Sequence, residues 1–295
     1  MLMKSPSPAR AAMPAMLRRS QDNLRDTFRI VRRRLATRPA CYPQILWSIW
    51  IMAWVLLTMA VALRFDHVAG IMAKRWAFGT GGLNDFASFF TVFGLGGWYL
   101  IPSALVLLVA NLTDWRSLSR RARMTLYNWT CFAFMVLGSV ALSALVVNVL
   151  KYGIGRARPM HFDKLGDLSL HPLSMDATFA SFPSGHATTM GVIFGIALML
   201  LPQRRWLLLL FATSTVSSTR IFVGAHYPSD TIAGFGLGCA VAIVCALALG
   251  RLGFIFRSTK VGLPVAKTTF RLFQWAGKNG ARQTNIGIGA TPASI

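Results

Sequence analysis

The chain alternates between long apolar runs and short polar segments. Six runs are predominantly apolar, and most reach the ~20 residues that a helix needs to cross ~30 Å of hydrocarbon. These runs are 43–63, 86–110, 129–150, 186–201, 206–225 and 231–249. The fourth run is short and the fifth carries Arg220 near its end, so both fit as spans only if their polar ends line a shared pocket. The pattern predicts an all-α, polytopic membrane protein with six transmembrane helices in a bundle.

Composition agrees with a membrane protein. The 295 residues are 54% hydrophobic and only 14% charged, with a mean hydropathy of +0.51, which excludes an ordinary soluble domain of this length. The four cysteines fall in or beside predicted spans, so they indicate neither a disulfide framework nor a CxxC metal site.

The formal charge of +22 is distributed unevenly along the chain. Lys and Arg gather before residue 43, between 116 and 123, at 204–205 and after 250, whereas the other polar segments are nearly neutral. Six spans with both termini in the cytoplasm reproduce this asymmetry through the positive-inside rule. The basic surplus therefore indicates orientation and contact with anionic lipid head groups, with no nucleic acid as partner.

Three parts of the chain follow from these patterns. Residues 1–42 are predicted to be a basic cytoplasmic segment, disordered or amphipathic, with an organelle transit peptide as the alternative. Residues 43–250 form the six-span membrane domain. Residues 251–295 contain no acidic residue and are predicted to be a basic, disordered cytoplasmic tail.

Two cations follow the third run. Lys151 and Arg158 stand seven residues apart in "KYGIGRARP", which on a continuous helix would be two turns and one face. Gly153, Gly155 and Pro159 favour a turn of the backbone instead, and either geometry can direct both cations to one place. A lone basic residue at a span end usually only snorkels to the interface. These two lie on the side that the positive-inside rule depletes, which favours a functional role.

The segment "SFPSGHA", residues 181–187, opens the fourth run. Pro183 fixes φ, Ser184 is a favourable N-cap, and Gly185 allows close approach of a ligand to the backbone. Residues 184–186 are therefore expected to present free N–H groups at a helix N-terminus, which is an anion site. His186 would stand beside the anion, whereas an isolated histidine is more often a satisfied structural residue.

The segment "STRIFVGAHYPSDTIAG", residues 218–234, also places charged and titratable residues at the end of a span. Arg220 ends the fifth run, Pro228 is placed to open the sixth helix, and Asp230 stands four residues after His226. At this spacing the carboxylate can accept a hydrogen bond from the imidazole and fix its tautomer, which makes a nucleophile or base. Alternatively, Asp230 is only the N-terminal charge partner of its helix, a role that would leave Arg220 and His226 unexplained.

Two further patterns concern packing and the long polar loop. Gly191 and Gly195 in the fourth span, and Gly234 and Gly238 in the sixth, form small-xxx-small pairs that favour close helix packing, with dimerisation as the alternative. Arg156 and its neighbours in the loop after the third span are expected to be solvated, with contact to the part of a substrate away from the anion as the alternative.

Together the three motif segments supply three cations, a helix N-terminus, two histidines and one carboxylate. Several cations with an N–H cradle match a tetrahedral dianion such as phosphate. The sequence has no HExxH motif, no Asp-rich pair and no Cys ligands, so phosphoryl transfer without a metal or other cofactor is expected. In that reaction His226 attacks phosphorus and His186 protonates the leaving oxygen.

These residues resemble the three signature motifs of the type 2 phosphatidic acid phosphatase superfamily, which includes vanadium haloperoxidases and bacterial acid phosphatases. The family patterns K-x6-R-P, P-S-G-H and S-R-x5-H-x3-D match at 151–159, 183–186 and 219–230, with Thr219 in place of the usual Ser. The resemblance covers about residues 129–245. It implies an all-helical bundle of six spans with its site at the outer membrane–water boundary.

The resemblance also implies a role for each motif residue. His226 would form a phosphohistidine, Asp230 would orient it, and His186 would be the general acid. The phosphate would be held by Lys151, Arg158, Ser184, Gly185 and Arg220.

The resulting hypothesis is a metal-independent membrane lipid phosphatase that hydrolyses a phosphomonoester or diphosphate of a lipid. The candidates are lipid A, phosphatidylglycerophosphate, phosphatidate and undecaprenyl diphosphate. Its partners would be the lipid substrate and the bilayer, in a bacterial inner (plasma) membrane with the site facing the periplasm. The main alternative is a lipid phosphotransferase with the same intermediate; a haloperoxidase, or a scaffold or transporter with a retained phosphate pocket, fits less well. The oligomeric state stays open.

The predicted topology can be tested by cysteine labelling. Leu165→Cys lies in the loop predicted to be outside, and Arg120→Cys lies in a segment predicted to be cytoplasmic. A membrane-impermeant maleimide added to intact cells should label only Leu165→Cys, and both variants after permeabilisation. The reverse labelling of intact cells would overturn the topology.

Overall fold

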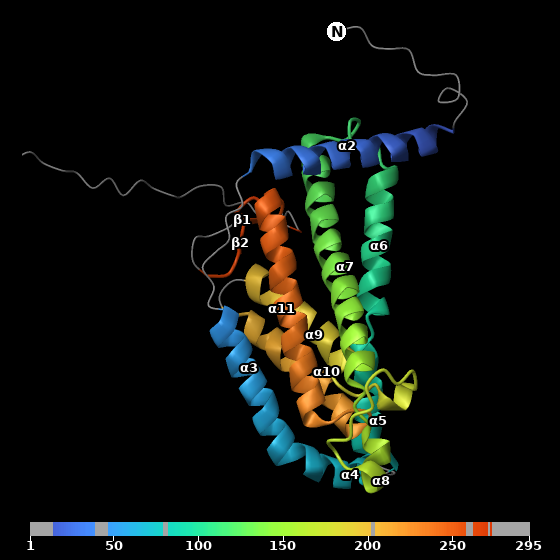
Figure 1. Cartoon of the computed structure of the whole chain (residues 1–295). Coiled ribbons are helices and arrows are strands. Elements are labelled where there is room, and N and C mark those ends of the chain that lie inside the picture. Colours follow the sequence, from blue (N-terminus) through green and yellow to red (C-terminus); the bar gives the residue numbers. More distant parts are fainter. Residues whose placement is uncertain are drawn as a thin grey trace, which may run out of the picture.

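The computed structural model describes residues 14–38, 47–78, 82–201, 204–257, 262–270 and 272, and its regular structure is almost entirely helical (Figure 1). The longer helices are α2 (Ala15–Thr37), α3 (Trp47–Val61), α4 (His67–Phe78), α5 (Gly82–Thr91), α6 (Gly97–Leu112), α7 (Arg120–Ile154), α9 (Gly185–Leu200), α10 (Trp206–Phe222) and α11 (Pro228–Leu252). Short helical turns are η1 (Ala62–Asp66), η2 (Val92–Gly94), η3 (Pro159–His161), α8 (Phe162–Leu165) and η4 (Ala177–Phe179). Within these ranges the expected helical class is confirmed, and the described residues also form an antiparallel hairpin of β1 (Phe256–Arg257) and β2 (Val265–Ala266).

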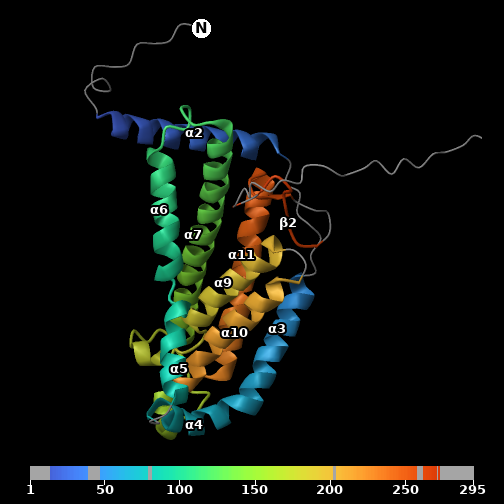
Figure 2. The same ribbon diagram turned by 180° about the vertical axis from the view of Figure 1, so that it is seen from behind.

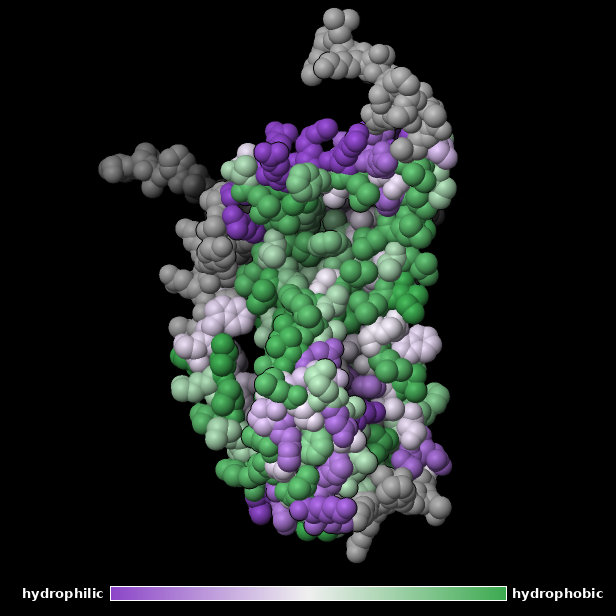
Figure 3. All heavy atoms as spheres, turned by 45° about the vertical axis from the view of Figure 1, so that its right-hand side comes forward, coloured by the Kyte–Doolittle hydropathy of each residue, from purple (hydrophilic) through white to green (hydrophobic). Residues whose placement is uncertain are grey.

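Four helical stretches in the described part of the chain are long and apolar enough to cross a membrane. They are Trp47–Ala73, Gly82–Leu112, Arg120–Ile154 and Pro228–Leu252. On the face that Figure 3 shows, apolar side chains form a band between more polar ends. The chain is therefore a helical membrane protein.

The fourth and fifth apolar runs form shorter helices. α9 has 16 residues and α10 has 17, so each is only about 25 Å long at 1.5 Å per residue. α9 is enclosed by α7, α10 and α11 in both views (Figures 1 and 2), and most of its side chains are buried by protein. Protein contacts can therefore satisfy its polar end, and the count of six spans stays a prediction.

The closest packing in the bundle is between α9 and α11. A Cβ on Gly191 would collide with the backbone carbonyl of Phe235, and a Cβ on Gly238 would collide with that of Thr188. Glycine at these two positions lets the two helices that carry motif residues approach backbone to backbone. The small-residue pattern therefore marks packing within this chain.

α2 lies across the upper end of the bundle in Figures 1 and 2, at the ends of α6, α7 and α11. Its side chains bind terminal carbonyl groups of the helices beneath it: Asn23 Nδ2 donates to the carbonyls of Asn111 at 2.7 Å and Thr113 at 3.0 Å. Arg34 Nη1 donates to that of Leu252 at 3.1 Å. These bonds satisfy acceptors that every helix leaves open at its C-terminus. Part of the basic N-terminal segment is thus an ordered helix that caps the bundle.

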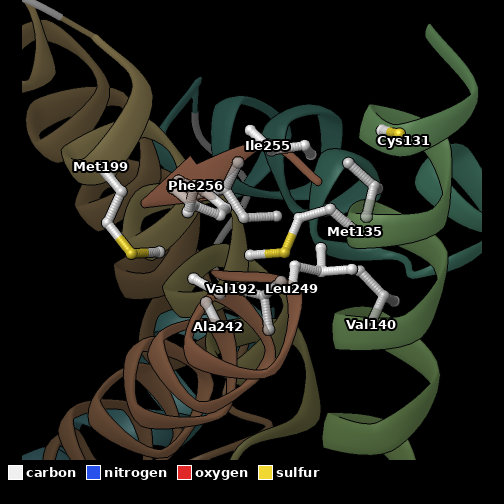
Figure 4. Packing of buried hydrophobic residues seen from close by; sticks show 12 residues of the cluster. Cys131, Met135, Val140, Val192, Met199, Ala242, Leu249, Ile255 and Phe256 are labelled. Atoms are coloured by element: carbon white, nitrogen blue, oxygen red, sulfur yellow. The ribbon is translucent and has the colours of Figure 1, made fainter. Parts of the chain in front are cut away.

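The apolar core lies between α7, α9, α11 and the hairpin (Figure 4). Met135, Val192 and Ala242 from the three helices meet Ile255 and Phe256, which are fully buried. These last two belong to the segment for which the sequence predicts a disordered tail; residues 258–261, 271 and 273–295 of that segment lie outside the described residues. The hairpin closes the α2 end of the core.

The first span is attached to the bundle near its lower end. Trp54 Nε1 donates to the carbonyl of Ile232 in α11 at 3.1 Å. Below this contact the helix widens into the π-turn η1, whose last residue, Asp66, is fully buried. α4 then turns beneath the bundle towards the loop that carries η3 (Figure 1). The first span thereby delivers a carboxylate to the region where the motif residues lie.

The glycine contact between α9 and α11 can be tested with a matched pair of variants. Gly238→Ala should lower the midpoint of thermal unfolding in detergent, corresponding to a loss of about 1–3 kcal/mol, because its methyl group meets backbone. Gly138→Ala in α7 has no atom within 4 Å of the new Cβ. It should leave the midpoint unchanged or raise it, because Gly inside a helix costs roughly 0.5–1 kcal/mol relative to Ala. Equal midpoints for the two variants would contradict the packing.

Candidate active site

The motif residues lie at helix ends and adjoining turns in the lower half of the bundle as drawn in Figure 1. The ends of α7, α9, α10 and α11 meet there. They carry Lys151, Arg158, Ser184, Gly185, His186, Arg220, His226 and Asp230.

The two cations of the first motif come from different backbone structures. α7 continues through Lys151 and ends at Ile154, and Gly155 then adopts φ +66°, where a Cβ would also strike the carbonyl of His171. Arg158 follows this turn as the residue before η3. Lys151 Nζ donates to the carbonyl of Ala180 at 3.1 Å. Both expected geometries thus contribute: a helix for the lysine and a glycine turn before the arginine.

The second motif forms the N-terminus of α9. Ser184 occupies the N-cap position, but its hydroxyl does not cap the helix, and the expected capping bond is therefore absent. Its backbone N–H instead donates to the carbonyl of Asp230 at 2.9 Å, and its buried Oγ has no partner. Gly185 begins the helix, and a Cβ there would lie 4.0 Å from Lys151 Nζ. The N-terminus of α9, the free hydroxyl and the lysine thus border one space.

The third motif forms a buried histidine–aspartate pair. His226 Nδ1 lies 3.6 Å from Asp230 Oδ2, with side-chain exposures of 2% and 0%. The distance exceeds that of a hydrogen bond, as is common in catalytic pairs before substrate binds. Asp230 Oδ2 also accepts the backbone N–H of Tyr227 at 2.9 Å, because α11 begins at Pro228 as expected. Asp230 therefore does both things that the sequence left as alternatives: it caps its helix and faces the imidazole.

Arg220 lies in the last turn of α10, and a residue of α5 holds its side chain. Its Nη1 donates to Thr91 Oγ1 at 3.1 Å, while its Nε is buried without a partner. Thr219, the departure from the family pattern, donates its hydroxyl to the carbonyl of Val216 at 2.6 Å. That hydroxyl binds the backbone of its own helix, so exchange of Ser for Thr leaves the site unchanged.

Several basic groups of the motif segments lie close to His186. It lies within electrostatic reach of Arg220, His226, Lys151 and Arg158. Burial, the larger effect, and the proximity of basic groups explain why the pKa of His226 is lowered to about 4 despite the opposing Asp230 carboxylate. At neutral pH its imidazole is therefore uncharged, and its unshared electron pair is available to attack an electrophile.

Several polar atoms here are buried without a hydrogen-bond partner. Among the residues that the structure describes, they include Arg158 Nε, Ser184 Oγ and Arg220 Nε. Because buried polar groups are nearly always paired, an unpaired set gathered at one place indicates a ligand site. Two guanidinium groups, a lysine and a hydroxyl suit a phosphate group. In the same described ranges, no group of three or more His, Cys, Asp or Glu could hold a metal ion.

A cavity of about 180 Å³ adjoins two of the residues that the sequence predicts to bind phosphate. Lys151 and Gly185 border it together with the apolar side chains of Leu100, Val140 and Val147. It lies between α6, α7 and α9. The site therefore combines cationic groups with an apolar space beside them.

Four functional candidates were missed at the sequence level. Arg156, expected in solvent, is only 4% exposed and binds Asp230, so the expectation of a solvated side chain is wrong. Asp66, Ser181 and Ser229 are also buried in this network. Asp66 and Arg156 are 90 residues apart and belong to no common motif, so no spacing rule could have paired them. The available signal was a single acid at the end of an otherwise apolar run.

Comparison with known proteins identifies related sequences. Residues 132–253 match the family model described as the PAP2 superfamily. The chain is 34% identical over 241 residues to a lipid A 1-phosphatase of Rhizobium etli, which covers 81% of this chain and 99% of that protein. It is 38% identical over 183 residues to a lipid A 1-phosphatase of Rhizobium johnstonii, covering 61% and 74%. An undecaprenyl-diphosphatase of Sulfolobus acidocaldarius is 30% identical over 106 residues, covering 36% and 50%.

The lowered pKa of His226 can be measured directly. NMR titration of protein labelled with ¹⁵N in its histidine rings should show His226 neutral down to about pH 4, against about 6.5 for an unperturbed imidazole. His226→Gln identifies the resonance. Because unfolding restores the ordinary pKa, the stabilising contribution of neutral His226 is complete above pH 6.5 and is lost as the pH falls towards 4. An imidazole that titrates near 6.5 in the folded protein would contradict its burial.

Proposed function

Because the chain belongs to the PAP2 superfamily and is a membrane lipid phosphatase, we propose that it removes the 1-phosphate of lipid A at the outer face of a bacterial inner membrane. The observation that carries the chemistry is the buried His226–Asp230 pair beside unpaired cationic groups. The two lipid A 1-phosphatases that resemble this chain over most of their length support the choice of substrate.

The first step is attack by His226 on phosphorus. Nδ1 faces Asp230, so a proton on Nδ1 leaves Nε2 with the electron pair that forms the N–P bond. The bond from phosphorus to the sugar oxygen breaks, and His186 donates its proton to that oxygen. The negative charge of the bound phosphate favours protonated His186 despite the surrounding cations. The products are phosphohistidine and lipid A without this phosphate.

The second step releases inorganic phosphate. Neutral His186 accepts a proton from a water molecule whose oxygen attacks phosphorus, and the N–P bond to His226 breaks. Throughout both steps Lys151, Arg158 and Arg220 would offset the charge on the phosphoryl oxygens, together with the N–H groups that begin α9. All charge compensation would thus come from protein groups.

The lipid part of the proposed substrate would explain why an apolar cavity adjoins the site. The cavity bordered by Lys151, Leu100 and Val147 lets apolar groups approach while the phosphate stays with the cations. Because positive charge is retained in the cytoplasm, the basic α2 end would face the cytoplasm and the opposite, site-bearing end the periplasm. This orientation would allow the polar sugars of lipid A to remain in water.

A substrate panel tests the proposal. With purified protein in mixed micelles, kcat/KM for phosphate release should be at least about tenfold higher for lipid A than for phosphatidate, phosphatidylglycerophosphate or undecaprenyl diphosphate, about 1.4 kcal/mol of discrimination. EDTA should not change the rate. His226→Ala should lower release by about 1,000-fold or more, because no covalent intermediate can form.

His67→Ala is the matched control, because His67 is exposed and outside the predicted site; it should retain activity. Full release by His226→Ala would refute the nucleophile. Loss of activity in EDTA with recovery in a divalent cation would refute the metal-independent mechanism. A higher kcat/KM for undecaprenyl diphosphate, the substrate in the name of the Sulfolobus acidocaldarius relative, would reassign the substrate.

A further inference from the structure

The carboxylate that faces His226 is itself held by a buried arginine. Arg156 Nη1 lies 2.6 Å from Asp230 Oδ1, and Arg156 Nη2 lies 2.8 Å from Asp66 Oδ2. The arginine side chain is 5% exposed and both carboxylates are fully buried. A single guanidinium therefore joins Asp230 of α11 to Asp66 of the first span.

The two oxygens of Asp230 have different partners. Oδ1 accepts from Arg156, whereas Oδ2 accepts from Ser181 Oγ at 2.6 Å and from the N–H of Tyr227 at 2.9 Å, and faces His226. Because a carboxylate is planar and rigid, binding of Oδ1 by the guanidinium limits rotation about its side-chain bond. The direction in which Oδ2 points therefore depends on Arg156.

Arg156 is in turn fixed from several sides. Its Nε and Nη2 donate to the carbonyl of Asp167 at 3.0 and 2.6 Å, and its guanidinium lies 4.4 Å from the ring centroid of Tyr227. Asp66 takes a remaining donor of Arg156 and also accepts the N–H of Ser229 at 3.0 Å and the Ser229 hydroxyl. Asp66 thus ties the arginine to the first turn of α11.

The electrostatics agree with this arrangement. Burial would lower the pKa of Arg156, but Asp230 and Asp66 together raise it above its ordinary value, so the guanidinium is always charged. One cation shared by two carboxylates leaves Asp230 partly uncompensated on the side of His226. That side is where a protonated Nδ1 is stabilised.

We propose that Arg156 and Asp66 are positioning residues for phosphoryl transfer: Asp66 holds the guanidinium of Arg156, and Arg156 holds Asp230 with Oδ2 directed at His226. The proposal rests on the proposed function, because it assigns these residues to the pair that carries the chemistry. Within the described part of the chain, the side chains of Arg156 and Asp66 form no hydrogen bond or ion pair with the residues proposed to bind phosphate. Asp66 also lies outside residues 132–253, so the first span would contribute to a site whose motif residues are in the matched region.

The tautomer of His226 is the most direct measurement, and it needs no substrate. The chain has only five histidines, so ¹⁵N-labelled rings can be assigned one by one. In the wild type, the proton should reside on Nδ1 of His226. In Arg156→Met and in Asp66→Asn it should be shared between both ring nitrogens, because Asp230 Oδ2 is no longer held in place. Asp230, Lys151 and Arg220, the charged groups that face His226, are unchanged in both variants.

Kinetics provide the second measurement. Both variants should lower kcat by about 100-fold, the cost expected from misplacement by about 1 Å, with KM within about twofold because the phosphate-binding groups remain. Arg156→Met with Asp66→Asn should lose little more than Arg156→Met alone, because Asp66 acts mainly through the arginine. Arg156→Lys keeps the buried charge and should recover part of kcat. It serves as the second variant if Arg156→Met does not fold.

Asp85→Asn is the matched control, because it makes the same substitution at an exposed position of α5. It should change neither the tautomer nor kcat. Lower thermal stability of Asp66→Asn and Arg156→Lys, with an unchanged tautomer and unchanged kcat per folded molecule, would overturn the proposal and leave a purely structural role. A wild type that cleaves none of the lipids would refute the proposed function alone, since the tautomer is measured without substrate.

Discussion

Charge that is buried near a bilayer must be compensated inside the protein, and in this chain the compensation centres on Asp230. Its carboxylate is fully buried and meets Arg156, Ser181, the backbone of Tyr227 and the imidazole of His226. Removing one partner of a buried ion pair typically costs about 3–5 kcal/mol, because the remaining charge is left in a medium of low dielectric constant. The first span, the loop after α7, the N-terminus of α9 and α11 are therefore held together by one polar cluster.

The same cluster explains how the site can be polar within an apolar molecule. Helix ends carry unpaired backbone groups, and here the ends of α7, α9, α10 and α11 come together. These groups and the basic side chains compensate one another or face the space in which we propose that phosphate binds. Such convergence requires close approach of α9 and α11, which Gly191 and Gly238 permit. It also explains the shortness of α9, because protein encloses the helix and its N-terminus serves the site.

Burial lowers the pKa of both a histidine and an arginine in the site, with different consequences. It keeps His226 uncharged, as a nucleophile requires, and it deprives Arg158 of water, which lowers the pKa of that guanidinium and leaves a buried donor free. In the proposed function, a bound phosphate dianion would reverse the second penalty, since it would supply the acceptors and the negative charge that the cations lack. Phosphate binding would then increase the electrostatic stability of this part of the molecule.

Sequence patterns determined the helical class, because in apolar runs of this length only a helix pairs all backbone N–H and C=O groups within a membrane. They also determined the motif residues, because the spacing of residues within one segment shows which side chains can act together. Tertiary structure alone decided that Asp66 and Arg156 join the cluster, that Ser184 leaves its hydroxyl free, and that part of the N-terminal segment forms a helix across the bundle. These features depend on contacts between segments far apart in the chain. Asp66 and Arg156 are 90 residues apart, so no periodicity or spacing in the sequence links them. Only the packing of the first span against α11 brings Asp66 within 2.8 Å of Arg156.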